Sequence, residues 1–172
     1  LVVLTEEIVE KTNWYNWFND EEITKNMQKH YYPNTKEMQI SYLRNEVEGN
    51  IKKLQLGIVN KKDQVMIGTI SLNNIDYINR RCSASCIIGE KMYQRDIRNF
   101  FEAHMLIIKH AFESLDLNRI EGGTINKVIK DMLCRYVGFK SEGTLRQCVY
   151  KHGKYHDVFL HSILYEDYLK IE

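Results

Sequence analysis

The chain contains 172 residues, of which 44% are hydrophobic and 27% charged, as is typical of a single globular domain. Its 24 Lys and Arg residues face 23 Asp and Glu residues, and the resulting formal charge of +1 argues against a general nucleic-acid-binding protein. No apolar run approaches the roughly 20 residues that span a bilayer, and residues 1–7 lack the features of a secretory signal. These properties predict a cytoplasmic protein with neither a membrane nor a nucleic acid as partner.

The four cysteines do not show the pattern of a disulfide framework or of a metal site. Cys82 and Cys86 lie on one predicted strand, where a separation of four residues corresponds to about 13 Å, too far for a disulfide. No C-x2-C pair is present, which disfavours a zinc site. The sequence therefore indicates reduced thiols, and no metal ion is predicted.

The first 50 residues are predicted to be mainly helical. Residues 11–28 carry both tryptophans and indicate one or two short helices, with Asn19 or Asp20 as the cap between them. Asn34 is predicted to cap a further helix, with Glu37 at the capping-box position. Side chains roughly on one face of that helix are Met38, Tyr42, Leu43 and Val47.

The middle of the chain changes to the two-residue period of β-strands. Three strands are predicted here, at residues 54–60, 64–76 and 81–89. Because the links between them are short, the three strands are expected to form an antiparallel meander.

The last part of the chain alternates between helical and strand patterns. The predicted elements are a helix at 100–114, a strand at 119–125, a helix from its cap Asn126 to about residue 137, and a hairpin of strands 142–151 and 155–164. Strand–helix–strand units beside a meander favour a mixed α+β sheet.

Three sequence blocks near the end of the chain carry a family resemblance. They are Gly138-Phe-Lys-Ser-Glu-Gly-Thr-Leu-Arg146, Gly153-Lys-Tyr-His-Asp157 and Leu160-His-Ser-Ile-Leu164. In this order they resemble the GF-x-x-EGTLR, G-x-Y-x-D and L-x-S-x-L ending of one branch of the GNAT superfamily of N-acetyltransferases. That branch contains ribosomal-protein N-acetyltransferases and bacterial amino-sugar acetyltransferases. Residues 14–20 and 33–35 resemble the opening of the amino-sugar members, and the resemblance covers nearly the whole chain.

The resemblance implies a single acyl-CoA N-acyltransferase domain over residues 1–172. The implied fold is α+β, with a mixed, mostly antiparallel sheet that is splayed at its centre and flanked by helices. The implied activity is that of an acetyl-CoA-dependent N-acetyltransferase of a small-molecule amine, with a nucleotide-linked amino sugar as the preferred acceptor. The alternatives are a protein N-terminal acetyltransferase of the ribosomal-protein type and a non-catalytic GNAT-fold binding module. A monomer or a homodimer is expected.

The resemblance also places the cofactor. In the superfamily two neighbouring strands separate, and their unpaired backbone groups bind the pantetheine arm of coenzyme A like an added strand. Asn126 follows the second of these strands and is expected to cap the next helix or to bind the arm. The corresponding edges here are Cys86, Ile87, Ile88 and Gly89 on one strand and residues 122–125 on the other.

The pyrophosphate-binding motif of the superfamily, Q/R-x-x-G-x-G/A, is altered in this chain. Its glycines allow backbone N–H groups to approach the phosphates at a helix N-terminus, but no glycine occurs between Gly89 and Gly122. Either Arg95 and Arg98 bind the phosphates through their guanidinium groups, or bulky side chains fill the site and abolish binding. An aspartate in the loop would repel phosphate or cap the helix. The cofactor candidates in this loop are Arg95, Asp96, Ile97, Arg98, Asn99 and Phe100.

The catalytic candidates are side chains that could move a proton, because the acceptor amine must be deprotonated and the departing thiolate stabilised. Glu90 stands just beyond the first splayed strand and would act through water, with a solvated charge as the alternative. The thiolate-protonating tyrosine of many relatives falls on Cys134 here. Tyr136 lies on the same predicted helix but on a different face.

Aromatic and polar side chains are the candidates for acceptor binding. An aromatic ring on the first helix would stack on a sugar, with packing in the core as the alternative, and two tyrosines lie in a predicted loop before the only proline. Two serines occupy strand positions near which some relatives carry an acid. An aspartate on the last strand would orient the substrate or hold the hairpin turn. These candidates are Trp17, Tyr31, Tyr32, Ser83, Ser85 and Asp157.

Overall fold

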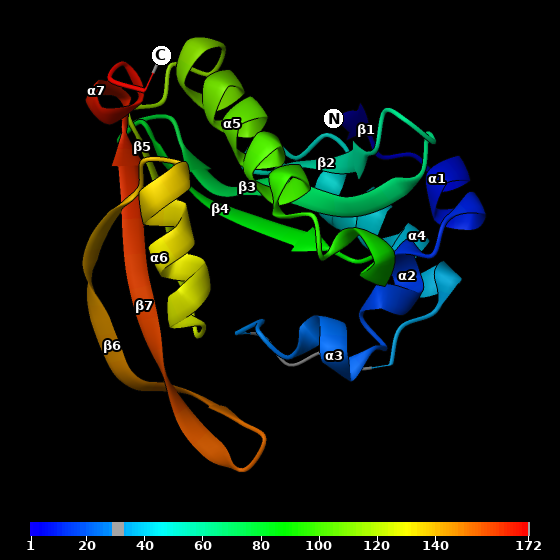
Figure 1. The fold of residues 1–172 in the computed structure, drawn as a ribbon. Coiled ribbons are helices and arrows are strands. Elements are labelled where there is room, and N and C mark those ends of the chain that lie inside the picture. Colours follow the sequence, from blue (N-terminus) through cyan, green and yellow to red (C-terminus); the bar gives the residue numbers. More distant parts are fainter. Residues whose placement is uncertain (29–32, 172) are drawn as a thin grey trace.

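The computed structural model describes residues 1–28 and 33–171 (Figure 1). Its strands are β1 (Val2–Val3), β2 (Leu54–Val59), β3 (Met66–Asp76), β4 (Arg81–Ile88), β5 (Arg119–Thr124), β6 (Lys140–Lys151) and β7 (Lys154–Leu164). Its helices are α1 (Glu6–Lys11), α2 (Trp14–Trp17), α3 (Glu21–Thr24), α4 (Lys36–Tyr42), α5 (Ile97–Glu113), α6 (Lys127–Tyr136) and α7 (Tyr165–Tyr168), with a π-helical turn at Leu43–Val47 and a 3-10 turn at Lys91–Tyr93. The meander, both long helices and the final hairpin are confirmed, whereas the sequence predicted no β1, α1 or α7.

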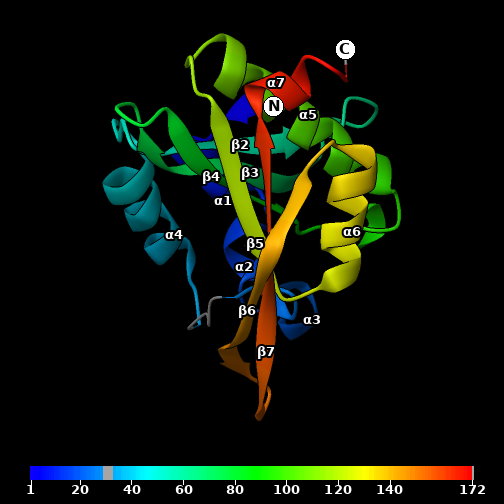
Figure 2. The same cartoon turned by 90° about the vertical axis from the view of Figure 1, so that its left-hand side faces the viewer.

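All strands belong to one seven-stranded sheet with the order β1-β2-β3-β4-β5-β7-β6. Every neighbouring pair is antiparallel except β4 and β5, which are parallel and joined through α5. Helices flank the sheet on both sides, with α4 and α6 at opposite sides in Figure 2. The predicted α+β class with a mixed, mostly antiparallel sheet is therefore confirmed.

Of the helix caps predicted in the first 50 residues, Asp20 is confirmed and Asn34 is wrong. Asp20 caps α3, because its carboxylate accepts hydrogen bonds from the backbone N–H groups of residues 22 and 23 at 3.0 and 3.4 Å. The cap of α4 is Thr35, whose hydroxyl accepts from Met38 N at 3.2 Å, rather than the predicted Asn34. The Asn34 amide instead donates to Gln39 Oε1 at 2.8 Å. The helix therefore begins one residue later than predicted, and Met38 is 52% exposed while Gln39 is buried.

Two hydrophobic cores hold the helices against the sheet. The larger core packs α5 and α6 against the sheet and includes Ile70, Leu72, Ile107 and Ile120. The smaller core joins the N-terminal helices to the start of β3 and consists of Leu4, Val9, Trp14, Trp17, Leu43 and Met66. Within the described ranges, no helix has the length and apolar character needed to cross a membrane.

The sheet opens between β4 and β5. The two strands pair only at Arg81↔Arg119, Cys82↔Ile120 and Ser83↔Glu121. Beyond these pairs β4 continues to Ile88 and β5 to Thr124. The predicted splay at the C-terminal halves of these neighbouring strands is confirmed.

Candidate active site

The open edge of β4 carries the predicted cofactor residues 86–89. The opposite edge of β4 is paired with β3, because residues 86–88 pair with residues 68–70. Cys86 and Ile88 pack against the larger core, and burial raises the pKa of the Cys86 thiol. The edge that faces β5 has no partner strand along residues 84–88. Backbone groups in the middle of the sheet thus lack a partner strand, although the Ile88 carbonyl accepts a hydrogen bond from the Gln94 side chain.

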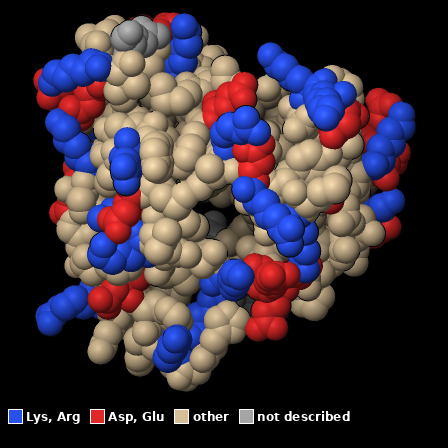
Figure 3. Space-filling view, viewed as in Figure 1, with Lys and Arg blue, Asp and Glu red and all other residues tan. Residues whose placement is uncertain are grey.

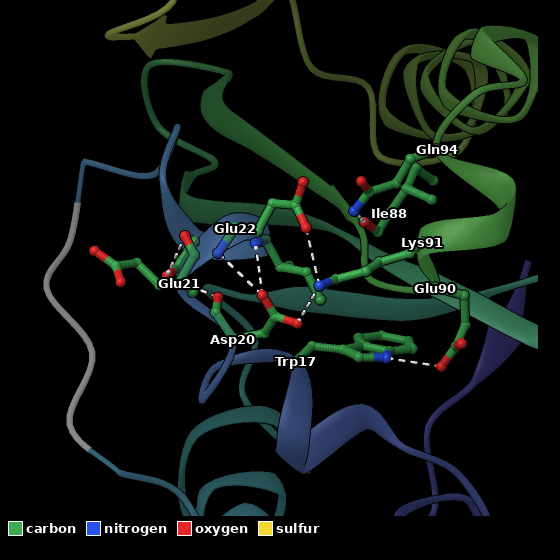
Figure 4. Close-up of polar contacts among 10 residues, drawn as sticks. Trp17, Asp20, Glu21, Glu22, Ile88, Glu90, Lys91 and Gln94 are labelled. Carbon is green, nitrogen blue, oxygen red and sulfur yellow. Dashed lines mark hydrogen bonds and ion pairs between the residues drawn. The ribbon is translucent and has the colours of Figure 1, made fainter.

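Trp17 packs directly under the end of β4 (Figure 4). A Cβ atom on Gly89 would lie 1.9 Å from the indole ring, so only glycine fits there. The indole is 1% exposed, and its Nε1 donates a hydrogen bond to Glu90 Oε1 at 2.9 Å. Trp17 is therefore a core residue that orients Glu90, which agrees with the core-packing alternative for this residue rather than with an open aromatic wall.

The loop between β4 and α5 is tied to α3. Lys91 Nζ lies 2.8 Å from Asp20 and 2.9 Å from Glu22, and its hydrogen bonds lower the pKa of both carboxyl groups (Figure 4). The Gln94 amide donates to the carbonyl of Ile88 at 2.8 Å. The glycine-free loop is thus held by side chains.

A carboxylate stands at the N-terminus of α5. Asp96 caps the helix, because its carboxylate accepts a hydrogen bond from Arg98 N at 3.1 Å. Capping was one of the two alternatives predicted for this residue, the other being repulsion of phosphate. The Arg98 guanidinium binds the same carboxylate through two contacts of 2.8 Å and lowers the pKa of Asp96. Arg95 is exposed, and Phe100 packs against His104 at a ring distance of 4.3 Å. Ile97 and Asn99 belong to the first turn of α5.

The open end of β5 is contacted from the N-terminal region. The Gln28 amide donates to the carbonyl of Gly123 at 2.5 Å, two residues beyond the last pair with β4. Asn126 caps α6, because its Oδ1 accepts from Val128 N at 3.0 Å and Ile129 N at 3.3 Å. Its Nδ2 donates to Asn26 Oδ1 at 3.1 Å. The predicted cap is confirmed, and the same side chain also joins α6 to the segment after α3.

Asn126→Ala is expected to lower the free energy of unfolding by about 1 kcal/mol, because it removes an N-cap. Urea denaturation of the variant and of wild type measures this difference. Asn126→Asp keeps the cap oxygen, so it is expected to lower the free energy of unfolding by less than Asn126→Ala does. If alanine and aspartate cost equally little, the cap does not stabilise α6.

The structure does not bring the three catalytic candidates together. Cys134 packs against the larger core, and burial raises the pKa of its thiol. Tyr136 is 55% exposed, with its ring 5.2 Å from that of Phe101. Among the described residues, no hydrogen bond or ring contact joins Glu90 to either of them. Their roles remain predictions.

Ser83 and Ser85 lie in a polar network on the face of β4 opposite α5. The hydroxyls of Ser85 and Ser71 are 2.8 Å apart, and the Asn73 amide donates to both at 3.1 Å. The Ser83 hydroxyl donates to the carbonyl of Asn73 at 3.3 Å. Sequence reasoning missed Ser71 and Asn73, although their alternation with the hydrophobic residues Ile70 and Leu72 was a usable signal. The face beside the splay is therefore rich in uncharged hydrogen-bonding groups.

Charged groups on β5 and β6 adjoin this network and neutralise one another. The Arg119 guanidinium binds Glu142 through contacts of 2.7 and 2.6 Å and Glu121 at 3.0 Å. The Ser162 hydroxyl donates to Glu142 at 2.7 Å, and hydrogen bonds from Arg119 and Ser162 lower the pKa of that carboxyl to about 2. These carboxylates are thus partly compensated within the protein.

Asp157 holds a β-bulge rather than the hairpin turn. Its Oδ1 accepts a hydrogen bond from Gln147 N at 2.8 Å, at the register shift between Leu145 and Val149. A hollow of about 420 Å³ is lined by Arg146, Gln147 and Asp157. A substrate contact of Asp157 remains a prediction. Tyr31 and Tyr32 lie outside the described residues.

Comparison with known proteins identifies the relatives of this chain. It is 30% identical over 107 residues to the "Putative ribosomal N-acetyltransferase YdaF" of Bacillus subtilis (strain 168), covering 59% of this chain and 55% of that protein. It is 31% identical over 123 residues to the "Uncharacterized N-acetyltransferase p20" of Bacillus licheniformis, covering 71% and 67%. The chain thus spans between about half and two thirds of the length of these curated relatives.

The fold is shared with solved acetyltransferase structures. The spermidine N-acetyltransferase from Vibrio cholerae, solved in complex with CoA and spermine, superposes with a TM-score of 0.84 at 20% identity, covering 96% of this chain and 95% of that one. This likeness concerns the fold. The model of the acetyltransferase (GNAT) domain matches residues 3–127. The chain therefore belongs to the GNAT acetyltransferase family, as its closing sequence blocks indicated.

Proposed function

We propose that this chain transfers the acetyl group of acetyl-CoA to the amine of a small molecule. The separation of β4 and β5 carries this proposal, because it leaves backbone N–H and C=O groups without a partner strand in the middle of a sheet. Such groups are normally paired, and the amide-bearing pantetheine arm can pair with them. Figure 3 shows a hollow near the centre of this face, with both basic and acidic side chains around it.

The residues present fit coenzyme A. Residues 86–89 and 122–124 would hold the pantetheine arm, and Arg95 and Arg98 would bind the pyrophosphate at the start of α5. When bound, acetyl-CoA supplies the activated thioester. Calorimetric titration of acetyl-CoA tests this step, and the absence of heat at millimolar ligand would favour the non-catalytic module.

Arg95→Ala/Arg98→Ala is expected to weaken acetyl-CoA binding at least tenfold, because a charge-assisted contact contributes about 1.5–3 kcal/mol. Asp96→Asn keeps the cap and removes a negative charge beside the phosphates, so it should tighten binding. Calorimetry measures both changes. The control variant is Arg44→Ala, because Arg44 lies on the π-helical turn and pairs with Glu6 of α1. Unchanged affinity in the double variant would contradict the role given to the two arginines.

In the proposed mechanism, Glu90 receives a proton from the acceptor amine through water. The Trp17 hydrogen bond fixes Oε1, so the second carboxylate oxygen can accept the proton. A hydroxyl or thiol on α6 would donate a proton to the departing sulfur. Cys134, which stands at the position of the relatives' tyrosine, and Tyr136 are the two candidates.

The preferred acceptor is a nucleotide-linked amino sugar. The polar face beside the splay offers hydroxyl and amide groups, while Arg119 compensates the nearby carboxylates. Such a surface suits a polyhydroxyl ligand better than a polycation such as spermine, which the Vibrio cholerae enzyme binds. A thiol-release assay with UDP-glucosamine, spermidine and a peptide N-terminus tests this choice. Preferred turnover of the peptide would favour the ribosomal type, which the Bacillus subtilis relative's name suggests.

A further inference from the structure

A buried histidine lies over the first open residue of β5. His161, on β7, is 5% exposed and pairs with Gly122 of β5. Gly122 directly follows Glu121, the last residue of β5 that pairs with β4. A Cβ atom on Gly122 would lie 2.6 Å from His161 Nε2, which would be its nearest neighbour. The tip of the imidazole therefore reaches from β7 across β5, at the closed end of the splay.

The imidazole lies on the helix side of the sheet. His161 shares a face of β7 with Ile163, which belongs to the larger core beneath α5 and α6. The His161 ring lies 5.0 Å from that of Phe139, another residue of this core. Cys134 packs against the same core from α6. The imidazole and this candidate proton donor are therefore on the same side of the splayed strands.

The imidazole is neutral and retains a hydrogen-bonding group for a ligand. Burial lowers the pKa of His161, and the charges of Lys130 and Glu142 act on it in opposite directions. Its Nδ1 is buried and has no hydrogen-bond partner among the described residues. A neutral imidazole carries one N–H, and a proton on Nδ1 would have no acceptor. The N–H therefore falls on Nε2, beside Gly122.

We propose that Nε2–H of His161 donates a hydrogen bond to the departing sulfur of coenzyme A. This inference rests on the proposed function, in which the pyrophosphate binds at the start of α5. The pantetheine arm then runs along β4 from residue 88 towards residue 84, so its sulfur end comes to the closed end of the splay, where Gly122 and the imidazole lie.

The hydrogen bond stabilises the negative charge that transfer creates. A bond forms between the acceptor nitrogen and the acetyl carbon, the C–S bond breaks, and the sulfur keeps the electron pair. His161 keeps its proton throughout, and the donor on α6 supplies the proton that completes the thiol. His161 is thus a catalytic residue that contacts the leaving group, distinct from the groups that move protons.

The pKa of the CoA thiol in the complex tests this contact, because a hydrogen bond to the thiolate lowers it. Thiolate absorbance measures it, with the desulfo-CoA complex as the blank for the protein's cysteines. His161→Phe keeps a ring without an N–H and should raise the thiol pKa by about one pH unit. It should also lower kcat at least tenfold and change the acetyl-CoA Kd less than twofold. His161→Gln, whose amide can donate, should recover part of both losses.

His104→Phe is the matched control. His104 is also buried, and its ring lies 6.5 Å from that of Phe139, but it donates within α5. This variant should leave the thiol pKa, kcat and Kd close to wild type.

Gly122→Ala provides a second test if His161→Phe does not fold. Its methyl group would displace Nε2, so the thiol pKa should rise at saturating CoA although the imidazole is present. A thiol pKa that is the same in wild type, His161→Phe and Gly122→Ala would overturn the proposal. If His161→Phe raises the thiol pKa but wild type acetylates none of the three acceptors named above, the proposed function is contradicted while the contact of His161 is supported.

Discussion

Trp17→Ala is expected to lower the free energy of unfolding by about 3–5 kcal/mol, as truncation of a buried tryptophan commonly does. The side chain is 1% exposed and packs in the smaller core against the backbone of Gly89. Removing it leaves a cavity under the end of β4. Urea denaturation measures the loss, and a change below 1 kcal/mol would contradict the packing described for this region.

Trp17→Phe separates the core role of this residue from its contact with Glu90. Phenylalanine retains much of the packing but cannot donate a hydrogen bond, so kcat/KM should fall at least tenfold if Glu90 is the base that we propose. Trp14→Phe is the matched control, because Trp14 lies in the same core and its Nε1 has no hydrogen-bond partner among the described residues. Equal activities of the two variants would contradict the role of Glu90.

The protein is expected to lose about 3 kcal/mol of stability between pH 6.5 and pH 4 through His104. Burial lowers the pKa of this imidazole from 6.5 to about 4 in the folded state. Below pH 6.5 the unfolded chain therefore binds a proton that the folded protein does not, and unfolding becomes easier as the pH falls. The Nδ1 atom of His104 lies 2.7 Å from the carbonyl oxygen of Phe100, so the neutral imidazole can donate its Nδ1–H to that carbonyl.

The pH dependence can be assigned by comparing two histidines of α5. His104→Gln should flatten the slope of unfolding free energy against pH between 4 and 6.5. His110 is exposed on the same helix, and His110→Gln should leave the slope unchanged. His161, whose pKa burial also lowers, would account for a residual slope. Identical slopes in wild type and His104→Gln would contradict a buried neutral His104.

Local patterns in the sequence predicted most of the fold. The two-residue period located the meander strands, and Asn126 was identified as a cap because it separates a strand from a helix. The cap of α4 was misplaced by one residue, because Asn34 and Thr35 are both suitable and only contacts with distant residues select between them. The splay itself was predicted from the family resemblance.

The sequence could not predict contacts between residues far apart in the chain. Gln28 meets Gly123 across 95 positions, and Lys151 meets Thr24 across 127. No local period reports such pairs. The burial of Trp17 was likewise undecided, because an aromatic residue on a short amphipathic helix suits a core and a pocket wall equally well. Trp17 is buried because Gly89, at the end of β4, leaves room for the indole ring to pack against the backbone.

The central claim is that the open edges of β4 and β5 bind the pantetheine arm of acetyl-CoA. Amide hydrogen exchange with and without saturating acetyl-CoA tests it most directly, because an amide that gains a partner exchanges more slowly. The proposal predicts at least tenfold slower exchange within residues 84–88 and 122–124, with no change in β3, which pairs with β2 on one side and β4 on the other. Unchanged exchange along both open edges at saturation would contradict it.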